Sequence, residues 1–172
     1  MSNKKFSFRS LFSGVLPPFM VAHCAHHLLM ALPAPLLPMI RSNFALGYTQ
    51  SGFVISAFSM AYGISQVLAG WLADYIGRRI MITVGILGVA LAGLLVGLSQ
   101  TYIMMIVFLV LMGLLGGGYH PAAPPILSAS VEPKNRGRVL GLHMIGGSAS
   151  YFNRLCCSGH PHTDGIAQIH EI

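Results

Sequence analysis

Three histidines lie close together in the first long apolar run of the chain, residues 14–39. His23, His26 and His27 are three and four positions apart, so a helix would place them roughly on one face. Imidazole is rare in a bilayer interior, where it tends to face a cavity or a polar partner. The cluster could therefore bind an anionic or polar solute, or carry protons near neutral pH. Simple hydrogen bonding to neighbouring helices is the open alternative.

A further histidine stands in the fourth apolar run, residues 102–127, at a weak point of the predicted helix. Tyr119-His120-Pro121 follows three consecutive glycines, and two more prolines come shortly after it. Glycine and proline together predict a weakened helix, and broken helices at membrane depth usually line a cavity. His143, further along, is expected to be a packed or interfacial histidine. We expect four residues to line one solute path, namely His23, His27, Tyr119 and His120.

Metal binding is a rival interpretation of these histidines and of the C-terminal tail. The spacing His-x-x-His-His also occurs in membrane di-iron desaturases, but those enzymes need several such boxes, and one box is found here. The tail has four candidate zinc ligands, Cys156, Cys157, His160 and His162. Adjacent cysteines chelate poorly, and the usual two-residue spacing between cysteines is missing. We therefore predict no metal site and no cofactor.

The segment from Gly70 to Arg79 places polar residues between two apolar runs. Asp74 comes three positions before Gly77, and Arg78 and Arg79 follow at once. An acid at the end of a helix can pair with an arginine or with a helix N-terminus, and the contact can break when the protein changes shape. Gly77 would supply the turn, and Gly70 would allow another helix to approach closely. An ordinary solvated loop is the alternative.

The composition excludes an ordinary soluble domain. Of the 172 residues, 54% are hydrophobic and only 8% are charged, whereas soluble domains carry about 25% charged residues. The four acids lie outside the long apolar runs, as the cost of a carboxylate in hydrocarbon predicts. The net charge of +6 is divided among clusters between apolar runs, so no nucleic-acid partner is expected. The three cysteines imply no disulfide framework.

The hydrophobic pattern predicts an all-α membrane protein, surrounded by lipid, with four complete transmembrane helices and a partial fifth. The expected spans are residues 14–39, 51–73, 80–98, 102–127 and 139–152. The fifth is shorter than the roughly 20 residues that a span needs. Residues 1–13 would form an N-terminal tail. Residues 153–172 would form an aberrant polar tail, as in an interrupted chain.

Lysine and arginine set the expected orientation. Eight basic residues fall in three segments that an alternating chain would bring to one side of the membrane, namely Lys4, Lys5, Arg9, Arg78, Arg79, Lys134, Arg136 and Arg138. By the positive-inside rule this side is cytoplasmic. We therefore expect an integral protein of a bacterial-type inner membrane, with a cytoplasmic N-terminus.

The Gly70–Arg79 segment resembles a signature of the major facilitator superfamily of secondary transporters, roughly Gly-x-Leu-Ala-Asp-x-x-Gly-Arg-Arg. Residues 133–141 look like the loop between the family's fourth and fifth helices. The Gly-Gly-Tyr-His-Pro segment is faintly similar to the fosmidomycin-resistance type of drug exporter. Two residues depart from the pattern: Tyr75 stands where a basic residue is frequent, and Leu109 stands where proton-driven exporters often carry arginine.

The resemblance covers about residues 14–152 and implies the N-terminal portion of a twelve-helix permease. Such a permease would have a cavity lined by helices one and four, and would move a small solute by alternating access. A C-terminal half would be the missing partner, and protons a candidate coupling ion. The implied cytoplasmic gate comprises Gly70, Asp74, Gly77, Arg78 and Arg79. An enzyme is not expected. The alternatives are a non-transporting fragment or partner-binding helical module and, less favoured, a histidine-box metalloenzyme.

Overall fold

The computed structural model describes residues 14–157, with side chains for residues 14–150. This part of the chain is helical and contains no strand, so the predicted all-α class is confirmed. The predicted N-terminal tail and most of the predicted C-terminal tail lie outside the described residues. In chain order the elements are α2 (Leu16–Ala31), α3 (Leu37–Asn43), α4 (Tyr48–Ile76), α5 (Arg78–Gly97), α6 (Tyr102–Gly116), α7 (Tyr119–Ala129), the 3-10 helix η1 (Pro133–Asn135) and α8 (Arg136–Cys157).

Three helical stretches among the described residues are long and apolar enough to cross a membrane. They are Tyr48–Ile76, Arg78–Gly97 and Tyr102–Ala129, the last being α6 and α7 taken together. They overlap the second, third and fourth predicted spans. The second predicted span, residues 51–73, is extended at both ends in α4.

The first apolar run forms two helices instead of one. α2 ends at Ala31, residues 32–36 form turns, and α3 follows. Pro33 and Pro35 lie in the turns, where a continuing helix would lose two amide donors and meet two ring clashes. The predicted unwinding of this end is confirmed, and a single continuous helix over residues 14–39 is not formed.

The expected weak point in the fourth apolar run is also present. α6 and α7 are separated by a turn at Gly117 and Gly118. The Gly118 N–H donates to the Leu115 carbonyl oxygen at 3.4 Å, which is the tighter bonding pattern of a 3-10 turn. Pro121 has no N–H to donate back to Gly117. The glycine and proline residues therefore weaken the helix where the sequence predicted it.

α8 differs from the predicted fifth span at both ends. It begins at Arg136 and continues to Cys157, whereas the prediction ended at residue 152. No glycine or proline follows Gly147 until Gly159, so nothing in the local sequence stops a helix at residue 152. The first five residues of the predicted polar tail are therefore helical.

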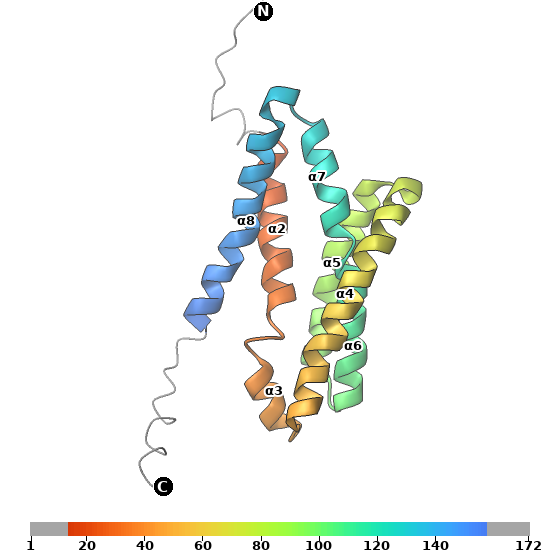
Figure 1. The fold of residues 1–172 in the computed structure, drawn as a ribbon, viewed down its shortest axis with the longest axis vertical. Helices are drawn as coiled ribbons and strands as arrows, with labels where there is room; N and C mark the ends of the chain where they lie inside the picture. Colours follow the sequence, from red (N-terminus) through yellow and green to blue (C-terminus); the bar gives the residue numbers. More distant parts are fainter. Residues whose placement is uncertain (1–13, 158–172) are drawn as a thin grey trace, which may run out of the picture.

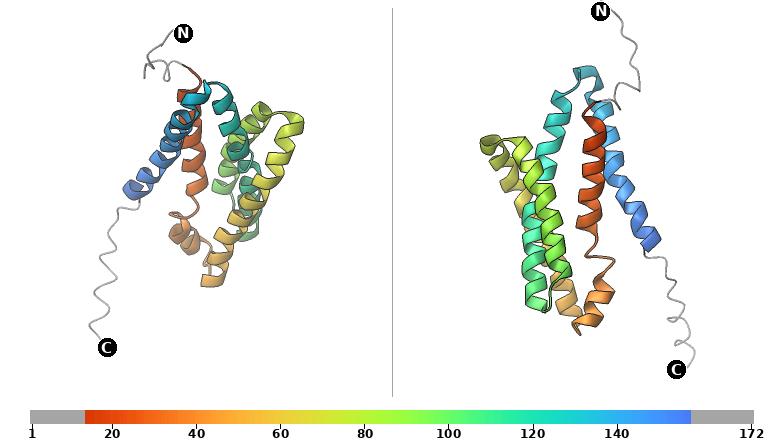
Figure 2. Two further views of the ribbon diagram at one scale, coloured as in Figure 1. Left: turned by 45° about the horizontal axis from the view of Figure 1, so that its top comes forward. Right: turned by 180° about the vertical axis from the view of Figure 1, so that it is seen from behind.

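The helices form two groups, and α7 joins them. α2 packs most extensively on α8, and the views in Figures 1 and 2 agree on this pair. In the other group α6 packs on both α4 and α5. α7 contacts α4, α5 and α8. The α4–α5 joint, the α7–α8 joint and the start of α2 lie at one end of the bundle (Figure 1).

Buried apolar side chains hold α4 and α6 together with their neighbours. Gly113 permits this contact, because a Cβ there would lie only 2.7 Å from the Phe58 carbonyl oxygen. The Ser65 hydroxyl lies 3.0 Å from the Gly113 carbonyl oxygen and adds a hydrogen bond between the two helices. The main buried cluster consists of Met30, Ile40, Leu46, Val54, Phe58, Val89, Ala92, Met105, Leu109 and Met112.

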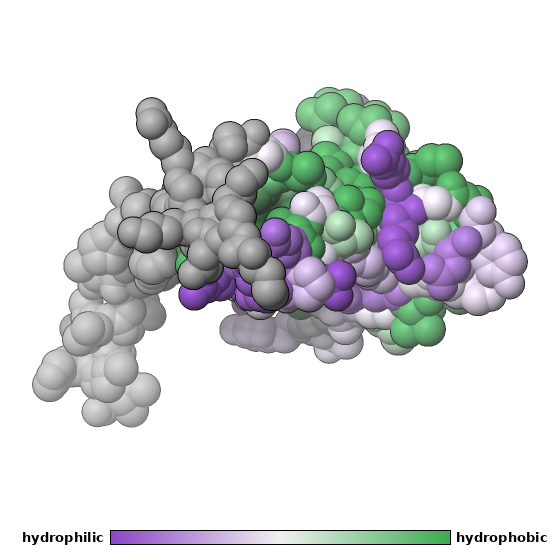
Figure 3. Space-filling view, turned by 90° about the horizontal axis from the view of Figure 1, so that it is seen from above, coloured by the Kyte–Doolittle hydropathy of each residue, from purple (hydrophilic) through white to green (hydrophobic). Residues whose placement is uncertain are grey.

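Large apolar side chains cover much of the outside. Val21, Val67 and Ile103 are 70%, 76% and 72% exposed, which suits a surface in contact with lipid. Figure 3 looks onto the end with the α4–α5 and α7–α8 joints, where hydrophilic residues gather between hydrophobic flanks. We call it the basic end, because the α4–α5 joint, η1 and the start of α8 contain Arg78, Arg79, Lys134, Arg136 and Arg138.

Candidate functional site

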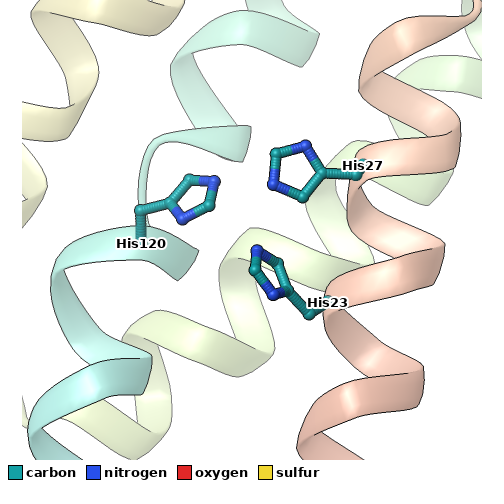
Figure 4. A group of neighbouring side chains, drawn as sticks. All are labelled: His23, His27 and His120. Atoms are coloured by element: carbon teal, nitrogen blue, oxygen red, sulfur yellow. The ribbon is translucent and has the colours of Figure 1, made fainter. Parts of the chain in front are cut away.

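Histidines from three helices meet in one cluster inside the bundle. α2 supplies His23, His26 and His27, the first turn of α7 supplies His120, and α8 supplies His143. Ring centroids are 4.7 Å apart for His23 and His27, 5.3 Å for His23 and His120, and 5.0 Å for His27 and His120. Figure 4 shows these three rings around a common space between α2 and α7. The histidines predicted to line a solute path therefore lie side by side, and the path itself stays a prediction.

His23 is held in place by α8. Its side chain is fully buried, and its Nδ1 lies 2.9 Å from the carbonyl oxygen of His143. Because a carbonyl can only accept, Nδ1 carries the proton, and in a neutral ring Nε2 keeps a lone pair. The two histidine rings stack with centroids 4.1 Å apart and planes at 16°. Gly147 leaves room for this ring, because a Cβ there would lie 2.6 Å from His23 Cε1.

Tyr119 ties α7 to α2 beside the cluster. Its hydroxyl donates to the carbonyl oxygen of Phe19 at 3.0 Å, and its side chain is fully buried. Its ring stacks on His26 with centroids 5.0 Å apart and planes at 20°. A buried tyrosine hydroxyl needs a hydrogen-bond partner, and the facing helix supplies one here. Tyr119 therefore holds the first turn of α7, including His120, against α2.

Several nitrogens of the cluster lack a hydrogen-bond partner among the described residues. They are His23 Nε2, both ring nitrogens of His26, and His143 Nδ1, all of them buried. A buried polar atom left unpaired costs about 1–3 kcal/mol, and native proteins keep few of them. The cluster therefore offers unfilled positions that could bind a polar ligand.

Two histidines of this cluster were not among the residues predicted to line the solute path. His26 was left out of the predicted path, yet its ring lies 5.4 Å from that of His120. Its three-residue spacing from His23 had already placed it on the same helix face in the sequence. His143 was expected to be packed, and it is, but its packing partner is His23. Nothing in the sequence indicates that α8 would lie against α2.

A groove opens at the basic end, beside the predicted gating motif. Its volume is about 1230 Å³, and its wall includes Asp74, Gly77, Arg78 and Arg79 from the α4–α5 joint. Residues at the start of α2 and the end of α7 form the opposite wall, among them Phe19. Four of the five predicted gating residues therefore line one surface.

The joint itself combines a weak ion pair with a turn that requires glycine. Arg78 Nη2 lies 3.2 Å from Asp74 Oδ1, and the two side chains are 47% and 67% exposed. Such a pair contributes about 0–1 kcal/mol, so it can open at little cost. Gly77 has φ 93°, a conformation that side chains rarely adopt, so the predicted turn is present. Arg79 is exposed beside it.

Gly70, the fifth predicted gating residue, lies against α7. A Cβ at Gly70 would be 3.6 Å from the Cβ of Pro121, which is an ordinary van der Waals distance. The predicted close approach of another helix is present, but an alanine would also fit there.

A second, smaller cavity borders the cluster on the side away from the groove. It has a volume of about 260 Å³ and lies between α2 and α4, with His27, Met30 and Tyr62 in its wall. On the side of the basic end, Phe19 lines the groove, and its ring centroid is 6.4 Å from that of His143. The cluster therefore lies between two cavities, and Phe19 lines the larger one next to His143.

Comparison with known proteins gives a family and several relatives. The profile of the Major Facilitator Superfamily matches residues 19–152, a range that contains both the cluster and the joint. The fatty acid resistance protein FarB of Neisseria gonorrhoeae is 33% identical over 106 residues, which cover 62% of this chain and 21% of that protein. The puromycin resistance protein pur8 of Streptomyces alboniger is 32% identical over 117 residues, covering 66% and 23%.

A third relative is named as a transporter. The probable sulfoacetate transporter SauU of Cupriavidus necator is 30% identical over 105 residues, covering 61% of this chain and 24% of that protein. The matches thus span between 21% and 24% of the length of these three relatives. No solved structure matches the chain significantly.

Proposed function

Since the chain belongs to the major facilitator superfamily, we propose that it forms the N-terminal portion of a secondary transporter that works by alternating access. Membership and the long apolar helices make it an integral membrane protein with a transporter role rather than an enzymatic one. The proposed cargo is a small polar or anionic solute. The observation that carries this proposal is the buried histidine cluster between two cavities.

The solute path is proposed to run past His23, His27, Tyr119 and His120. Polar rings in the middle of apolar helices are costly unless they meet a polar partner, and part of this cluster has none among the described residues. A neutral imidazole offers one donor and one acceptor, and the donor of His23 is already bonded to the His143 carbonyl oxygen. His23 Nε2 therefore suits a hydroxyl group of the solute, and the N–H groups that a carboxylate needs would come from His27 and His120. Two of the three relatives are named for a fatty acid and for sulfoacetate, which supports an acidic solute, and the third is named for puromycin.

The gate is proposed to be the α4–α5 joint. Asp74 and Arg78 are largely exposed in the groove at the basic end, where helices of a second half could cover them. Opening their pair would cost little, and Gly77 fixes the turn from which both side chains project. In this proposal Gly70, Asp74, Gly77, Arg78 and Arg79 open and close the cytoplasmic side.

Orientation and coupling complete the proposal. The basic end would face the cytoplasm of a bacterial cell, because short loops rich in lysine and arginine stay on that side. The N-terminus would then be cytoplasmic as well. The acids that the structure describes, Asp74 and Glu132, are exposed. If protons drive transport, a histidine of the cluster or a residue of the second half would carry them.

The transport proposal is tested by reconstitution. The chain, extended by the helices that complete the twelve-helix fold, would be placed in proteoliposomes, and uptake of labelled organic anions measured with and without a pH gradient. His27→Gln and His120→Gln should reduce uptake about 10- to 100-fold, since a hydrogen bond to a charged group contributes about 1.5–3 kcal/mol. Val21→Ala, at an exposed apolar position of α2, is the control. Uptake that survives both histidine changes would place the path elsewhere.

The orientation is tested separately with single cysteines in intact cells. A cysteine at Asn135, in η1, should resist a membrane-impermeant thiol reagent, and one at Gln100, between α5 and α6, should react. The opposite pattern would overturn the proposed orientation without affecting the transport result.

A further inference from the structure

We propose that His23, His27 and His120 form a binding site for one divalent transition-metal ion. One ring nitrogen from each residue lies within 4.8 Å of the other two. Figure 4 shows the three rings surrounding a common space, two from α2 and one from the start of α7. Zinc bound to histidine at about 2.0–2.1 Å in a tetrahedral site would need nitrogens roughly 3.3 Å apart. Small rotations of His27 and His120, which are only partly buried, would close this gap.

The second observation is the state of His23. Its Nδ1–H is committed to the His143 carbonyl oxygen, and its Nε2 is buried without a hydrogen-bond partner among the described residues. Metal-binding histidines almost always donate their other ring nitrogen to a carbonyl or carboxylate, which fixes the tautomer and the ring orientation. Two contacts further restrain the ring of His23. It stacks on His143, and it packs closely against Gly147, which has no side chain. His23 therefore has the outer-shell support expected of a preformed metal ligand.

Access to the site comes from the side opposite His23. His27 lines the cavity of about 260 Å³ between α2 and α4, so an ion could reach the rings without displacing the core. His23 forms the buried back wall, and His27 and His120 form the more accessible front. A site with one rigid ligand, His23, and two adjustable ligands, His27 and His120, suits reversible binding of an ion.

The ligand set favours a borderline metal ion. Imidazole suits zinc, copper, iron and nickel, whereas calcium and magnesium prefer oxygen ligands. Three histidines leave at least one coordination position open, as in catalytic zinc sites. The acids that the structure describes lie exposed in the α4–α5 joint and beside η1, and none of them belongs to this ligand group. An anionic group from solution would therefore fill the open position and offset the charge of the ion.

This inference rests in part on the proposed function, because the anionic ligand would be the transported solute. Metal binding itself does not depend on transport and is measured directly. The purified full chain in detergent, freed of metal with a chelator, would be titrated with Co²⁺ and then with competing Zn²⁺. We expect one Co²⁺ per chain, with the visible absorption of a tetrahedral nitrogen-rich site and displacement by Zn²⁺.

Variants identify the ligands. His27→Gln and His120→Gln should each lower Co²⁺ affinity by more than the roughly 10–100-fold that loss of an outer-shell partner costs. His27→Cys should retain binding and add a thiolate-to-cobalt absorption band that the unmodified chain, with its three cysteines, does not give. His160→Gln/His162→Gln is the matched control for histidines of the tail, and Cys24→Ser is the control on α2. Both controls should bind Co²⁺ as the unmodified chain does.

Three outcomes would overturn the metal site. They are no binding of Co²⁺ or Zn²⁺, binding that survives both glutamine variants of the cluster, and binding that disappears with the tail variant. The proposed transport function has a separate readout. If a chelator leaves uptake by the completed transporter unchanged while the histidine variants still reduce it, the solute path stands and the solute does not bind through the ion.

Discussion

The histidine cluster and the charged joint at residues 74–79 are both polar, yet they are built in opposite ways. The cluster combines rings from α2, α7 and α8, and three of them are almost completely buried, those of His23, His26 and His143. The joint is local, with Asp74 and Arg78 four positions apart and largely exposed. Because the cluster is buried, any change in the side chains around it alters its interactions strongly. Solvent and salt screen the charges of the joint, so changes near the joint have smaller effects.

The comparison teaches how a binding surface and a movable contact differ in physical terms. The cluster keeps unpaired nitrogens in a wall fixed by a backbone hydrogen bond and by stacked rings, which makes it ready for a ligand. In the joint, the ion pair between Asp74 and Arg78 is weak enough to open. The rigid part of the joint is the backbone turn at Gly77. Four substitutions test this difference, taken here from the largest expected effect to the smallest.

Gly147→Ala should have the largest effect on stability. The new methyl group would overlap the ring of His23, which cannot retreat because His143 holds it by a hydrogen bond and by stacking. Overpacking of this kind costs about 1–3 kcal/mol. The free energy of unfolding in mixed micelles, followed by circular dichroism, is the measurement. Gly141→Ala, on the same helix with no described atom within 4 Å, should cause no loss.

Gly77→Ala should show that the joint depends on its backbone. With φ 93° and ψ 137°, a conformation that side chains rarely adopt, any other residue at this position should cost roughly 1–3 kcal/mol. The same unfolding measurement applies, with Gly52→Ala in α4 as the control, because a methyl group there meets no described atom. Equal stability for the two variants would mean that the turn relaxes without cost.

Tyr119→Phe removes one hydrogen bond at the edge of the cluster and keeps the ring. Loss of the bond to the Phe19 carbonyl oxygen should lower the free energy of unfolding by about 0.5–1.5 kcal/mol. Tyr75→Phe removes a hydroxyl from a side chain that is 72% exposed and should have little effect. Similar losses for both variants would contradict a special role for the buried hydroxyl.

Asp74→Asn should have the smallest effect on stability. The coupling of Asp74 to Arg78 should be below about 1 kcal/mol and should decrease as salt is added. A double-mutant cycle with Arg78→Gln, measured at low and high salt, gives this value. A larger coupling that does not depend on salt would mean that the pair is less exposed than its 67% and 47% side-chain accessibilities indicate.

The sequence alone predicted the helical class, the long helices and the joint, though not the division of the first run into α2 and α3 or the bounds of α8. Apolar runs separated by short polar segments predicted the long helices, and proline and glycine predicted the weak points at residues 32–36 and at Gly117. Asp74, Gly77 and Arg78 lie within five positions of one another, so their turn and ion pair follow from local geometry. These features depend on backbone rules that act over a few residues.

Only the tertiary structure decided what the histidines form. His23 and His143 are 120 positions apart, and no local rule indicates that the His143 carbonyl oxygen fixes the tautomer of His23. That contact depends on α8 lying against α2, which requires Gly146 and Gly147 to face Met20 and His23 across the helix pair. Helical periodicity shows which residues share a face, but the partner of that face is selected by packing between distant segments.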